Sequence, residues 1–440
     1  MNYMDMMRKQ DSSRLAFVEE GREFSYGQLV TLAERMSRNA DVFSSVSASG
    51  RIHWIHKNKI SEQLIEFMAA NERGEIPVIV PEDRAVGSRD VEVATNLQSA
   101  MSDQESGLWD AKICMGVMTS GSTGEPKVLF RSYESWADYF DTQNQIFAIN
   151  QDSRLFAQGS LAFTGNLNMY LAAFYTGAAV IAQNAFQPRE WENLMKRYQV
   201  NAIYLIPSKL MCIPQVLQGD LPAVRTIVSG SQGMNRTDAD QLNKVFPGAR
   251  ITLYYGASEL SYISYITGEE MTEDRGLVGR PFPDVQIEVR DQQIYVTTPC
   301  CVAGVKCPFT VSDQGCLDEM GRLHFTGRSD DIVNVHGRKA SLLRIEKVLM
   351  EQPEIQSAVV LHLPGQKIRH KQQGCETGRI QVAFVVLQDQ MQMDSAFLKR
   401  LRHNLAGYEM PGRFVVLPEI PYRENGKVDR EKLREIYEAL

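Results

Sequence analysis

The chain has 440 residues, of which 43% are hydrophobic and 23% are charged, a balance typical of a soluble globular protein. This length predicts about two or three domains with room for a sizeable buried core. A formal net charge of −7 argues against a general nucleic-acid-binding surface, because such surfaces are strongly basic, and leaves only a local basic patch open.

The sequence carries no sign of export or of a membrane anchor. Residues 1–13 mix acidic and basic side chains and lack the apolar core of a secretory signal. The longest nearly apolar run, residues 171–182, is too short to span a bilayer and predicts a core element. We therefore expect a cytoplasmic protein without a membrane span.

Seven cysteines are present, an odd number, and without an export signal we do not expect disulfides. Cys300, Cys301, Cys307 and Cys316 lie close together in the sequence. Their spacings lack the paired knuckle of a zinc site, so we interpret them as small buried or surface thiols.

Helix and strand signals alternate from the N-terminus to about residue 275. A helix is predicted over 24–40, with Ser25 as N-cap and Gln28 at the capping-box position. Further helices are expected at 61–73 and 188–198, and buried strands at 76–81, 178–183, 202–206 and 224–229. This alternation predicts an α/β fold with parallel sheet, in which ligands bind at the carboxyl ends of the strands.

The pattern changes after about residue 275. Alternating polar and apolar residues over 285–297 predict antiparallel hairpins. A final segment, 330–440, predicts a small α+β domain whose boundary falls near residues 328–330. Its expected elements are helices at 341–351 and 395–405 and strands at 357–362 and 380–387.

The most informative segment is 119–127, Thr-Ser-Gly-Ser-Thr-Gly-Glu-Pro-Lys, which follows an apolar run. Backbone N–H groups of such a loop can converge on phosphate oxygens, its glycines permit close approach, and its lysine supplies a positive charge. The spacing differs from the P-loop fingerprint, so we interpret a nucleotide-binding loop of another kind rather than an ordinary surface loop. Its candidate residues are Thr119, Ser120, Gly121, Ser122, Thr123, Gly124 and Lys127.

A second segment, residues 255–259 (Tyr-Gly-Ala-Ser-Glu), follows a predicted strand at 251–254. The ring of Tyr255 could stack on a base, and Ser258 could bond a phosphate. Glu259 could hold Mg²⁺, a hard cation that prefers carboxylate oxygen. Residues 276–281 then predict a tight turn.

Later segments add further polar and charged groups. Asp313 could accept hydrogen bonds from two ribose hydroxyls. Residues 327–331 (Gly-Arg-Ser-Asp-Asp) lead to 335–339 (Val-His-Gly-Arg-Lys). Lys427 lies on a predicted tight turn within residues 425–430.

In this order and at these spacings, the segments resemble the motifs of the adenylate-forming superfamily. That family includes acyl- and aryl-CoA synthetases, the adenylation domains of nonribosomal peptide synthetases, and luciferases. The resemblance covers almost the whole chain, from Ser25 to Lys427. It implies a two-step reaction, in which a carboxylate attacks the α-phosphate of ATP to give acyl-AMP and pyrophosphate, and a thiol then displaces AMP.

The resemblance also implies roles for the matching residues. The loop 119–127 would order the β and γ phosphates, and Tyr255 with Gly256 would lie near adenine. Ser258 and Glu259 would serve phosphate and Mg²⁺. Asp313 would hold the ribose, and Arg328 and Lys339 would add positive charge to the cofactor site.

The family fold has a large N-terminal region of stacked α/β sheets with a small β-barrel-like subdomain, and a small mobile α+β lid. The resemblance therefore implies domains at 1–329 and 330–440. Asp330 matches the hinge, and Gly337 matches the lid glycine that lines the pantetheine tunnel. Lys427 matches the lysine that bridges the substrate carboxylate and the α-phosphate, where a positive charge removes the repulsion between two anions.

Some positions depart from the family pattern. Ser258 replaces the usual threonine and keeps its hydroxyl, while 311–313 (Val-Ser-Asp) replaces Thr-Gly-Asp and keeps the aspartate. The Pro-Leu-x-His segment has no counterpart in residues 159–168, so the acid is not predicted. Candidate residues of the acyl pocket, with core packing of the aromatics as the alternative, are Phe163, Tyr204, Ser229 and Gly230.

We therefore predict an ATP- and Mg²⁺-dependent ligase that joins a small-molecule carboxylic acid to CoA, giving an acyl- or aryl-CoA. One alternative is a stand-alone ligase that loads the phosphopantetheine of an acyl or peptidyl carrier protein, which a basic, accessible lid surface would favour. A non-catalytic nucleotide-binding protein is a further alternative. The presence of Lys127, Glu259, Asp313 and Lys427 argues against it, because a binder needs no lid lysine.

Overall fold

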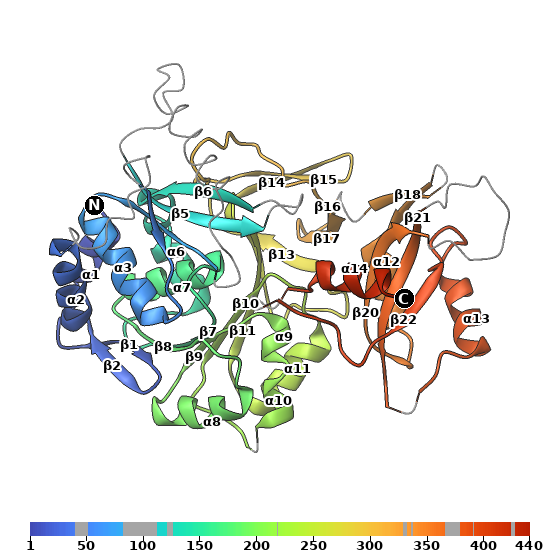
Figure 1. Cartoon of the computed structure of the whole chain (residues 1–440), viewed down its shortest axis with the longest axis horizontal. Helices are drawn as coiled ribbons and strands as arrows, with labels where there is room; N and C mark the ends of the chain where they lie inside the picture. The colour runs from blue at the N-terminus through green and yellow to red at the C-terminus, as the bar shows by residue number, and fades with distance from the viewer. Residues whose placement is uncertain are drawn as a thin grey trace. The chain divides into compact units, whose positions relative to one another are not determined.

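The computed structural model describes residues 1–39, 52–81, 112–120, 126–217, 219–328, 332–335, 338–365, 379–389, 391–423 and 427–440 (Figure 1). Contacts divide the chain into two compact units. The large unit holds Met1–Arg290, Tyr295–Val311 and Leu317–His324, and the small unit holds Asp291–Ile294, Ser312–Cys316 and Phe325–Leu440. The domain boundary predicted between residues 329 and 330 stays a prediction.

The main sheet of the large unit is parallel in its centre. Parallel pairs join β1 to β8, β8 to β7, β7 to β9, β9 to β10 and β10 to β11, while β12 and β13 continue antiparallel. In spatial order the strands are β13 (Leu277–Pro281), β12 (Ser261–Thr267), β11 (Arg250–Ala257), β10 (Thr226–Gly230), β9 (Ala202–Tyr204), β7 (Arg154–Gln158), β8 (Ala179–Gln183), β1 (Leu15–Glu19) and β2 (Arg22–Ser25). The α/β prediction is confirmed.

A second, four-stranded sheet of the large unit has the order β3 (Ile52–Ile55), β4 (Ile76–Ile79), β5 (Ile113–Ser120) and β6 (Pro126–Ser132). Helix α7 (Thr164–Tyr175) contacts β7 and β8 of the main sheet and also β5 of this sheet. It is apolar around most of its circumference, as a helix buried between two layers must be. The predicted stacking of sheets therefore holds in this unit.

Helices cover the main sheet with apolar side chains. Trp191 of α8 (Pro188–Arg197) and Leu242 of α11 (Arg236–Val245) pack with Ile203 and Ile227 of the strands. The remaining helices of the unit are α1 (Tyr3–Arg8), α2 (Tyr26–Arg38), α3 (Ile60–Glu72), α5 (Glu134–Ala137), α6 (Phe140–Phe147), α9 (Pro207–Leu210) and α10 (Ile213–Val216).

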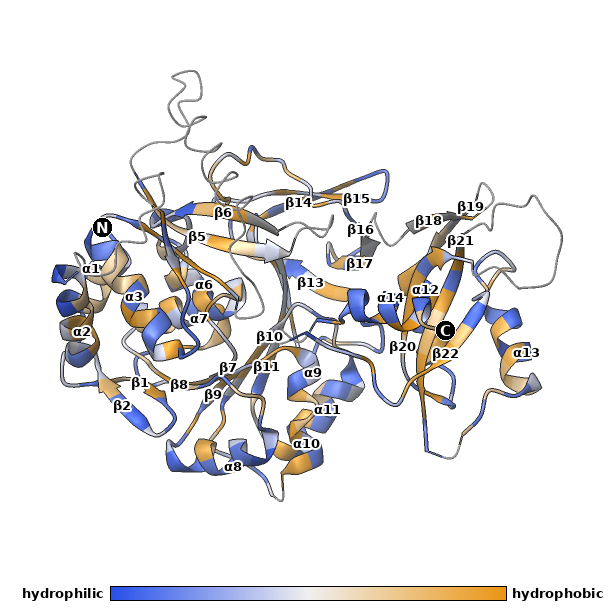
Figure 2. Cartoon of the chain, in the orientation of Figure 1, coloured by the Kyte–Doolittle hydropathy of each residue, from blue (hydrophilic) through white to orange (hydrophobic). Residues whose placement is uncertain are grey.

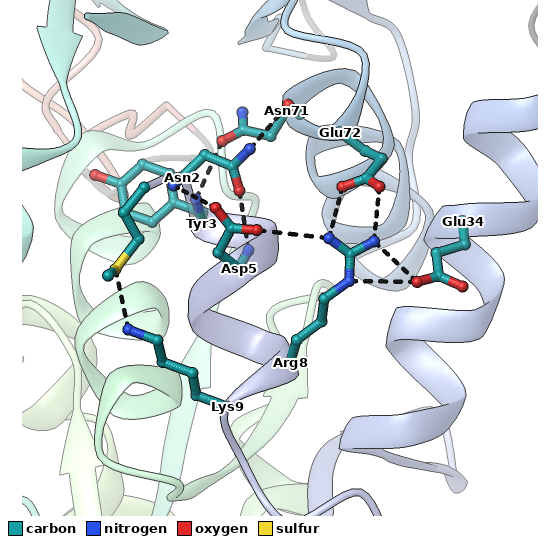
Figure 3. A network of polar contacts seen from close by, with 9 residues as sticks. Asn2, Tyr3, Asp5, Arg8, Lys9, Glu34, Asn71 and Glu72 are labelled. Atoms are coloured by element: carbon teal, nitrogen blue, oxygen red, sulfur yellow. Dashed lines mark hydrogen bonds and ion pairs between the residues drawn. The ribbon is translucent and has the colours of Figure 1, made fainter.

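Local rules place several of these elements where the sequence predicts them. The Ser25 hydroxyl accepts from the Gln28 backbone N–H, and the Gln28 side chain accepts from the Ser25 N–H, so the predicted capping box of α2 is confirmed. Residue 8 adds a long-range tie that the sequence did not predict. The Arg8 guanidinium lies 2.8 Å from Glu34 of α2 and 2.7 Å from Glu72 of α3, which joins three helices (Figure 3).

One predicted turn is wrong. Residues 276–281 were expected to form a tight turn, whereas Leu277–Pro281 form strand β13. Gly279 has φ +84° and lies at an irregularity in the pairing of β13 with β17 (Leu323–Arg328). A Cβ at this position would overlap the carbonyl oxygen of Tyr265. The glycine therefore marks a bulge within a strand rather than a reversal of the chain.

The alternating segment 285–297 forms β14 (Gln286–Arg290) and β15 (Gln293–Thr297), as predicted, and β15 pairs antiparallel with β16 (Asp313–Leu317). The small unit also contains a strand pair and a three-stranded sheet. Its elements are β18 (Ile332–Val335), β19 (Arg338–Ser341), α12 (Leu342–Met350), β20 (Ile355–Pro364), β21 (Arg379–Leu387), α13 (Ser395–Asn404), β22 (Arg413–Val416) and α14 (Arg430–Glu438).

Both faces of the three-stranded sheet are covered. Val360 and Val385 pack with Phe397 of α13 in one apolar cluster, whereas Leu361 and Phe384 belong to the cluster that includes α14. Figure 2 shows long hydrophobic stretches on β20 and β21. Since neighbouring residues of a strand face opposite sides, such stretches suit strands that are buried on both faces.

Candidate active site

The predicted nucleotide loop connects two paired strands. Thr119 at the end of β5 pairs with Lys127 of β6, and Ser120 pairs with Pro126. The apolar run before the loop is the buried part of β5, so the loop follows directly from a strand held in the core. Gly121, Ser122, Thr123 and Gly124 lie outside the described residues, as do the side chains of Ser120 and Lys127. Their binding roles stay predictions.

Ser258 and Glu259 lie in the short connection from β11 to β12. The two strands pair up to Ala257 and Ser261, and an irregularity in the pairing falls between Tyr255 and Gly256. A Cβ at Gly256 would overlap the carbonyl oxygen of Ser261, so this close approach requires glycine. The segment 255–259 thus ends a buried strand and presents its polar residues at the carboxyl end of β11, where α/β sheets bind ligands.

Arg131 is a site residue that the sequence analysis missed. Its guanidinium is fully buried on β6, and it donates to the Ser258 carbonyl oxygen at 2.7 Å and to the Cys300 carbonyl oxygen at 2.8 Å. The group also lies 4.8 Å from the ring of Trp136. Burial lowers the pKa of Arg131 to about 10, and the side chain stays cationic at neutral pH. The strand that leaves the nucleotide loop is therefore tied directly to the turn with Ser258 and Glu259.

The side chains of this turn supply hard oxygen donors. The Ser258 hydroxyl lies 3.4 Å from the hydroxyl of Thr164, at the start of α7. Within the described ranges, no hydrogen bond or ion pair engages the Glu259 carboxylate. No group of three or more metal-ligating side chains occurs in the part of the chain that is described. One carboxylate with a few hydroxyls fits Mg²⁺, which usually binds few protein ligands and takes the rest from water and phosphate.

Three of the four residues predicted for the acyl pocket lie near Tyr254, namely Phe163, Tyr204 and Gly230. The Tyr204 and Tyr254 hydroxyls lie 2.9 Å apart in the interior. A Cβ at Gly230 would overlap the Tyr254 ring, and a Cβ at Gly165 would lie 3.1 Å from both Phe163 and the Tyr254 hydroxyl. Burial raises the pKa of Tyr254 to about 12, so this phenol is neutral.

The Ser229 hydroxyl is already engaged. It is fully buried and donates to the Leu205 carbonyl oxygen at 2.7 Å, an arrangement that holds β10 next to the segment after β9. The pocket roles of Phe163, Tyr204, Ser229 and Gly230 stay predictions. The structure shows that Tyr204 and Tyr254 are packed in the interior.

The remaining predicted residues are placed individually. Tyr255 is half-buried opposite Ser264, and Asp313 is buried at the start of β16. Lys427 is exposed, and its carbonyl oxygen accepts from the Arg423 N–H at 2.8 Å. Residues 424–426 lie outside the described residues, so the tight turn predicted there stays a prediction. Arg328 ends β17 and Lys339 lies in β19, with side chains outside the described set; Asp330 and Gly337 lie outside it entirely.

Comparison with known protein families assigns the chain to one of them. The model of the family described as AMP-binding enzyme matches residues 42–304, more than half of the sequence. The chain belongs to this family. AMP-binding enzymes activate acids as adenylates, and membership identifies the protein as an ATP-using, AMP-forming acid–thiol ligase, as the motifs implied.

Two curated relatives of this AMP-binding enzyme illustrate the range of acceptors. The uncharacterised acyl-CoA ligase YhfT of Bacillus subtilis is 26% identical over 333 residues, which cover 72% of this chain and 67% of the relative. The D-alanine–D-alanyl carrier protein ligase of Lactococcus lactis is 25% identical over 351 residues, which cover 72% of this chain and 68% of the relative.

A solved structure supports the fold. The o-succinylbenzoate CoA synthetase of Bacillus subtilis, in complex with ATP and magnesium ion, matches with a TM-score of 0.79 at 17% identity and covers 98% of this chain and 99% of its own. The protein thus has the mixed α/β fold of adenylate-forming enzymes, with a large sheet domain and a smaller C-terminal domain. Among the described residues, no helix is both long and apolar enough to cross a membrane.

Proposed function

We propose that the protein activates a carboxylic acid with ATP and then transfers the acyl group to CoA. The observation that carries this proposal is the buried Arg131, which ties the strand leaving the nucleotide loop to the turn with Ser258 and Glu259. Two segments far apart in the sequence are thereby held as one unit, and such fixed positioning is what nucleotidyl transfer requires of a protein.

The chemistry has two steps. In the first, a carboxylate oxygen attacks the α-phosphorus of ATP, the bond to the bridging oxygen breaks, and pyrophosphate leaves. Both reactants are anions, so Lys127 and Lys427 would neutralise charge between them. Mg²⁺, held by Glu259 with Ser258 nearby, would supply further charge neutralisation on the phosphates. In the second step, the CoA sulfur attacks the acyl carbon and AMP leaves.

The names of one relative and one solved structure support CoA ligation. YhfT is named as an acyl-CoA ligase, and its alignment covers 72% of this chain. The synthetase that matches the fold over 98% of this chain is also a CoA synthetase by name.

A panel of acids tests the proposal. Pyrophosphate release from ATP would be measured with short aliphatic, long aliphatic and aromatic acids, each with and without CoA. We expect release with one class of acid, and a thioester only when CoA is present. Release that depends on acid, without any CoA thioester, would contradict the assignment of CoA as acceptor, and no release with any of these acids would contradict the proposed activity on them.

A carrier protein is the second candidate acceptor, and a surface of the small unit favours it. Helix α13 lines an open groove of about 570 Å³, in which Lys399 and Arg402 are exposed. Arg400 of the same helix is held by Glu354 and Gln352. Exposed cations of this kind suit an acidic protein partner. Substitution of Lys399 and Arg402 by glutamate should slow carrier loading without changing CoA thioester formation if this surface docks a carrier.

A further inference from the structure

A pair of thiols lies on a loop next to the candidate active site. The Sγ atoms of Cys301 and Cys307 are 2.8 Å apart, and both side chains are half-buried. The two arms of the loop are joined by a bridge between Val296 and Phe309, with N···O distances of 2.8 and 2.9 Å. The bridge holds the cysteines face to face, so their proximity is built into the fold.

Both thiols compete for one acceptor. Cys301 donates to the Thr298 carbonyl oxygen at 3.3 Å, and Cys307 lies 3.7 Å from the same oxygen. Burial and the neighbouring Cys307 raise the pKa of Cys301 to about 12. Cys301 therefore keeps its proton at neutral pH. Cys307 lies between two exposed residues, Lys306 and Pro308, whereas both chain neighbours of Cys301 are buried, so an outside reagent reaches Cys307 first.

The residues around Cys301 are bonded to the active-site turn. The Val302 N–H donates to the Glu259 carbonyl oxygen at 2.9 Å. The Cys300 carbonyl oxygen accepts from Arg131 at 2.8 Å, and the Ala303 N–H donates to the Phe130 carbonyl oxygen at 2.9 Å. Backbone hydrogen bonds thus connect the residue after Cys301 to Glu259, and Arg131 connects the residue before it to Ser258.

We propose that Cys301 and Cys307 are a reversible oxidation site, and that their disulfide slows the adenylation step. The second half of this statement rests on the proposed function. The bond needs a movement of under about 1 Å from the present sulfur separation. A displacement of this size at a catalytic group can lower a rate by up to about a hundredfold.

The oxidant is a low-molecular-weight disulfide. The Cys307 thiolate attacks one of its sulfur atoms and expels a small thiolate, which leaves a mixed disulfide. The Cys301 sulfur then gives up its proton and attacks the Cys307 sulfur, and the second small thiol leaves. Two protein thiols are oxidised to one disulfide while the small disulfide is reduced to two thiols, so electrons and protons balance.

The first experiment maps the bond. The full-length protein would be incubated with oxidised glutathione, alkylated and digested with trypsin. Because Lys306 lies between the two cysteines, a Cys301–Cys307 disulfide joins the tryptic peptides 291–306 and 307–322 into one mass that dithiothreitol separates. Each peptide also holds a second cysteine, Cys300 or Cys316, so fragmentation of the linked pair assigns the bond to Cys301 and Cys307. We expect this linked pair. Its absence, with both cysteines alkylated or carrying glutathione, would overturn the proposal whatever the protein's activity is.

The second experiment measures pyrophosphate release with an active acid. Oxidation should lower the rate about tenfold or more, and dithiothreitol should restore it. Cys301→Ser should be active and insensitive to oxidised glutathione, whereas Cys316→Ser, which changes an exposed cysteine outside the pair, should stay sensitive. Cys307→Ala replaces Cys301→Ser if the latter does not fold.

The outcomes separate the two proposals. A linked peptide pair with an unchanged rate would contradict the regulatory role and leave the proposed function intact. A reduced wild-type protein that releases no pyrophosphate with any acid would contradict the proposed function, while the peptide map would still decide whether the disulfide forms.

Discussion

The role of Glu259 as a Mg²⁺ ligand can be tested by a single substitution. Its carboxylate lies in the turn after β11 and has no hydrogen-bond or ion-pair partner within the described residues. If it holds Mg²⁺ beside the phosphates, Glu259→Gln should lower pyrophosphate release by about 10²–10³-fold and raise the Mg²⁺ concentration needed for half the maximal rate. Glu269→Gln, an exposed glutamate on a later turn, is the matched control and should change neither quantity. An unaltered Mg²⁺ requirement in Glu259→Gln would contradict the assignment.

Arg131 acts through its neighbours rather than on substrate. Arg131→Met removes the guanidinium that donates to the carbonyl oxygens of Ser258 and Cys300, so both oxygens lose this hydrogen bond. We expect the free energy of unfolding to fall by about 2–4 kcal/mol, measured by urea denaturation. In the folded fraction, kcat for pyrophosphate release should fall by a larger factor than KM for ATP rises. The reason is that a displaced turn would move Ser258 and Glu259 away from the reacting phosphates.

Arg236→Met is the control for this variant. Arg236 pairs with Asp240 on the surface of α11, with 48% of its side chain exposed, and exposed pairs of this kind contribute little. Its replacement should leave both the unfolding free energy and the rate nearly unchanged. Equal effects of the two substitutions would contradict the special role of the buried guanidinium.

At the scale of elements, β10 and β11 are held in contact by glycine. Gly230 of β10 faces the Tyr254 ring, which is fixed by the Tyr204 hydroxyl at 2.9 Å and by the Tyr262 ring at 4.7 Å. Gly230→Ala should therefore destabilise the protein by about 1–3 kcal/mol, because the ring cannot retreat. Gly219→Ala, where an added Cβ meets no atom within 4 Å, should be nearly neutral. Thermal unfolding of both variants checks this, and a neutral Gly230→Ala would show that the ring can move.

The helical layer formed by α1, α2 and α3 gives a second test at this scale. Arg8 joins the layer through Glu34 and Glu72 (Figure 3). Since 34% of its side chain is exposed, solvent screens the pairs, and Arg8→Ala should lower the unfolding free energy by only about 1 kcal/mol. The loss should shrink at high salt. A loss that is independent of salt would indicate packing of the arginine stem instead.

For the whole molecule, the sequence predicted features that depend on neighbours along the chain. The Ser25 cap and the alternation of strands with helices follow from local patterns, and both are observed. Gly276–Gly279 was misread because a bulge glycine and a turn glycine look alike in sequence. Arg131 gave no local signal, since its two acceptors lie 127 and 169 residues away.

The candidate site was predictable only in part for the same reason. Ser258 and Glu259 were recognised by their motif, whereas the ties that hold them come from β6 and from the loop after β15. The cysteine cluster was visible in the sequence, but the pairing of Cys301 with Cys307 depends on the bridge between Val296 and Phe309. Contacts of this kind arise from tertiary structure and are absent from any local pattern.

The central claim is that one protein performs two half-reactions, adenylation and thioester formation. A substitution of Lys427 should affect only the first of them. Lys427 would act between carboxylate and α-phosphate, where it is needed for adenylation only. The decisive measurement compares wild type and Lys427→Ala in acid-dependent pyrophosphate release and in thioester formation from supplied acyl-AMP and CoA. We predict that the substitution lowers the first rate by about 10²–10³-fold and leaves the second largely intact. Equal loss of both rates, or acid-independent release by the wild type, would contradict this account.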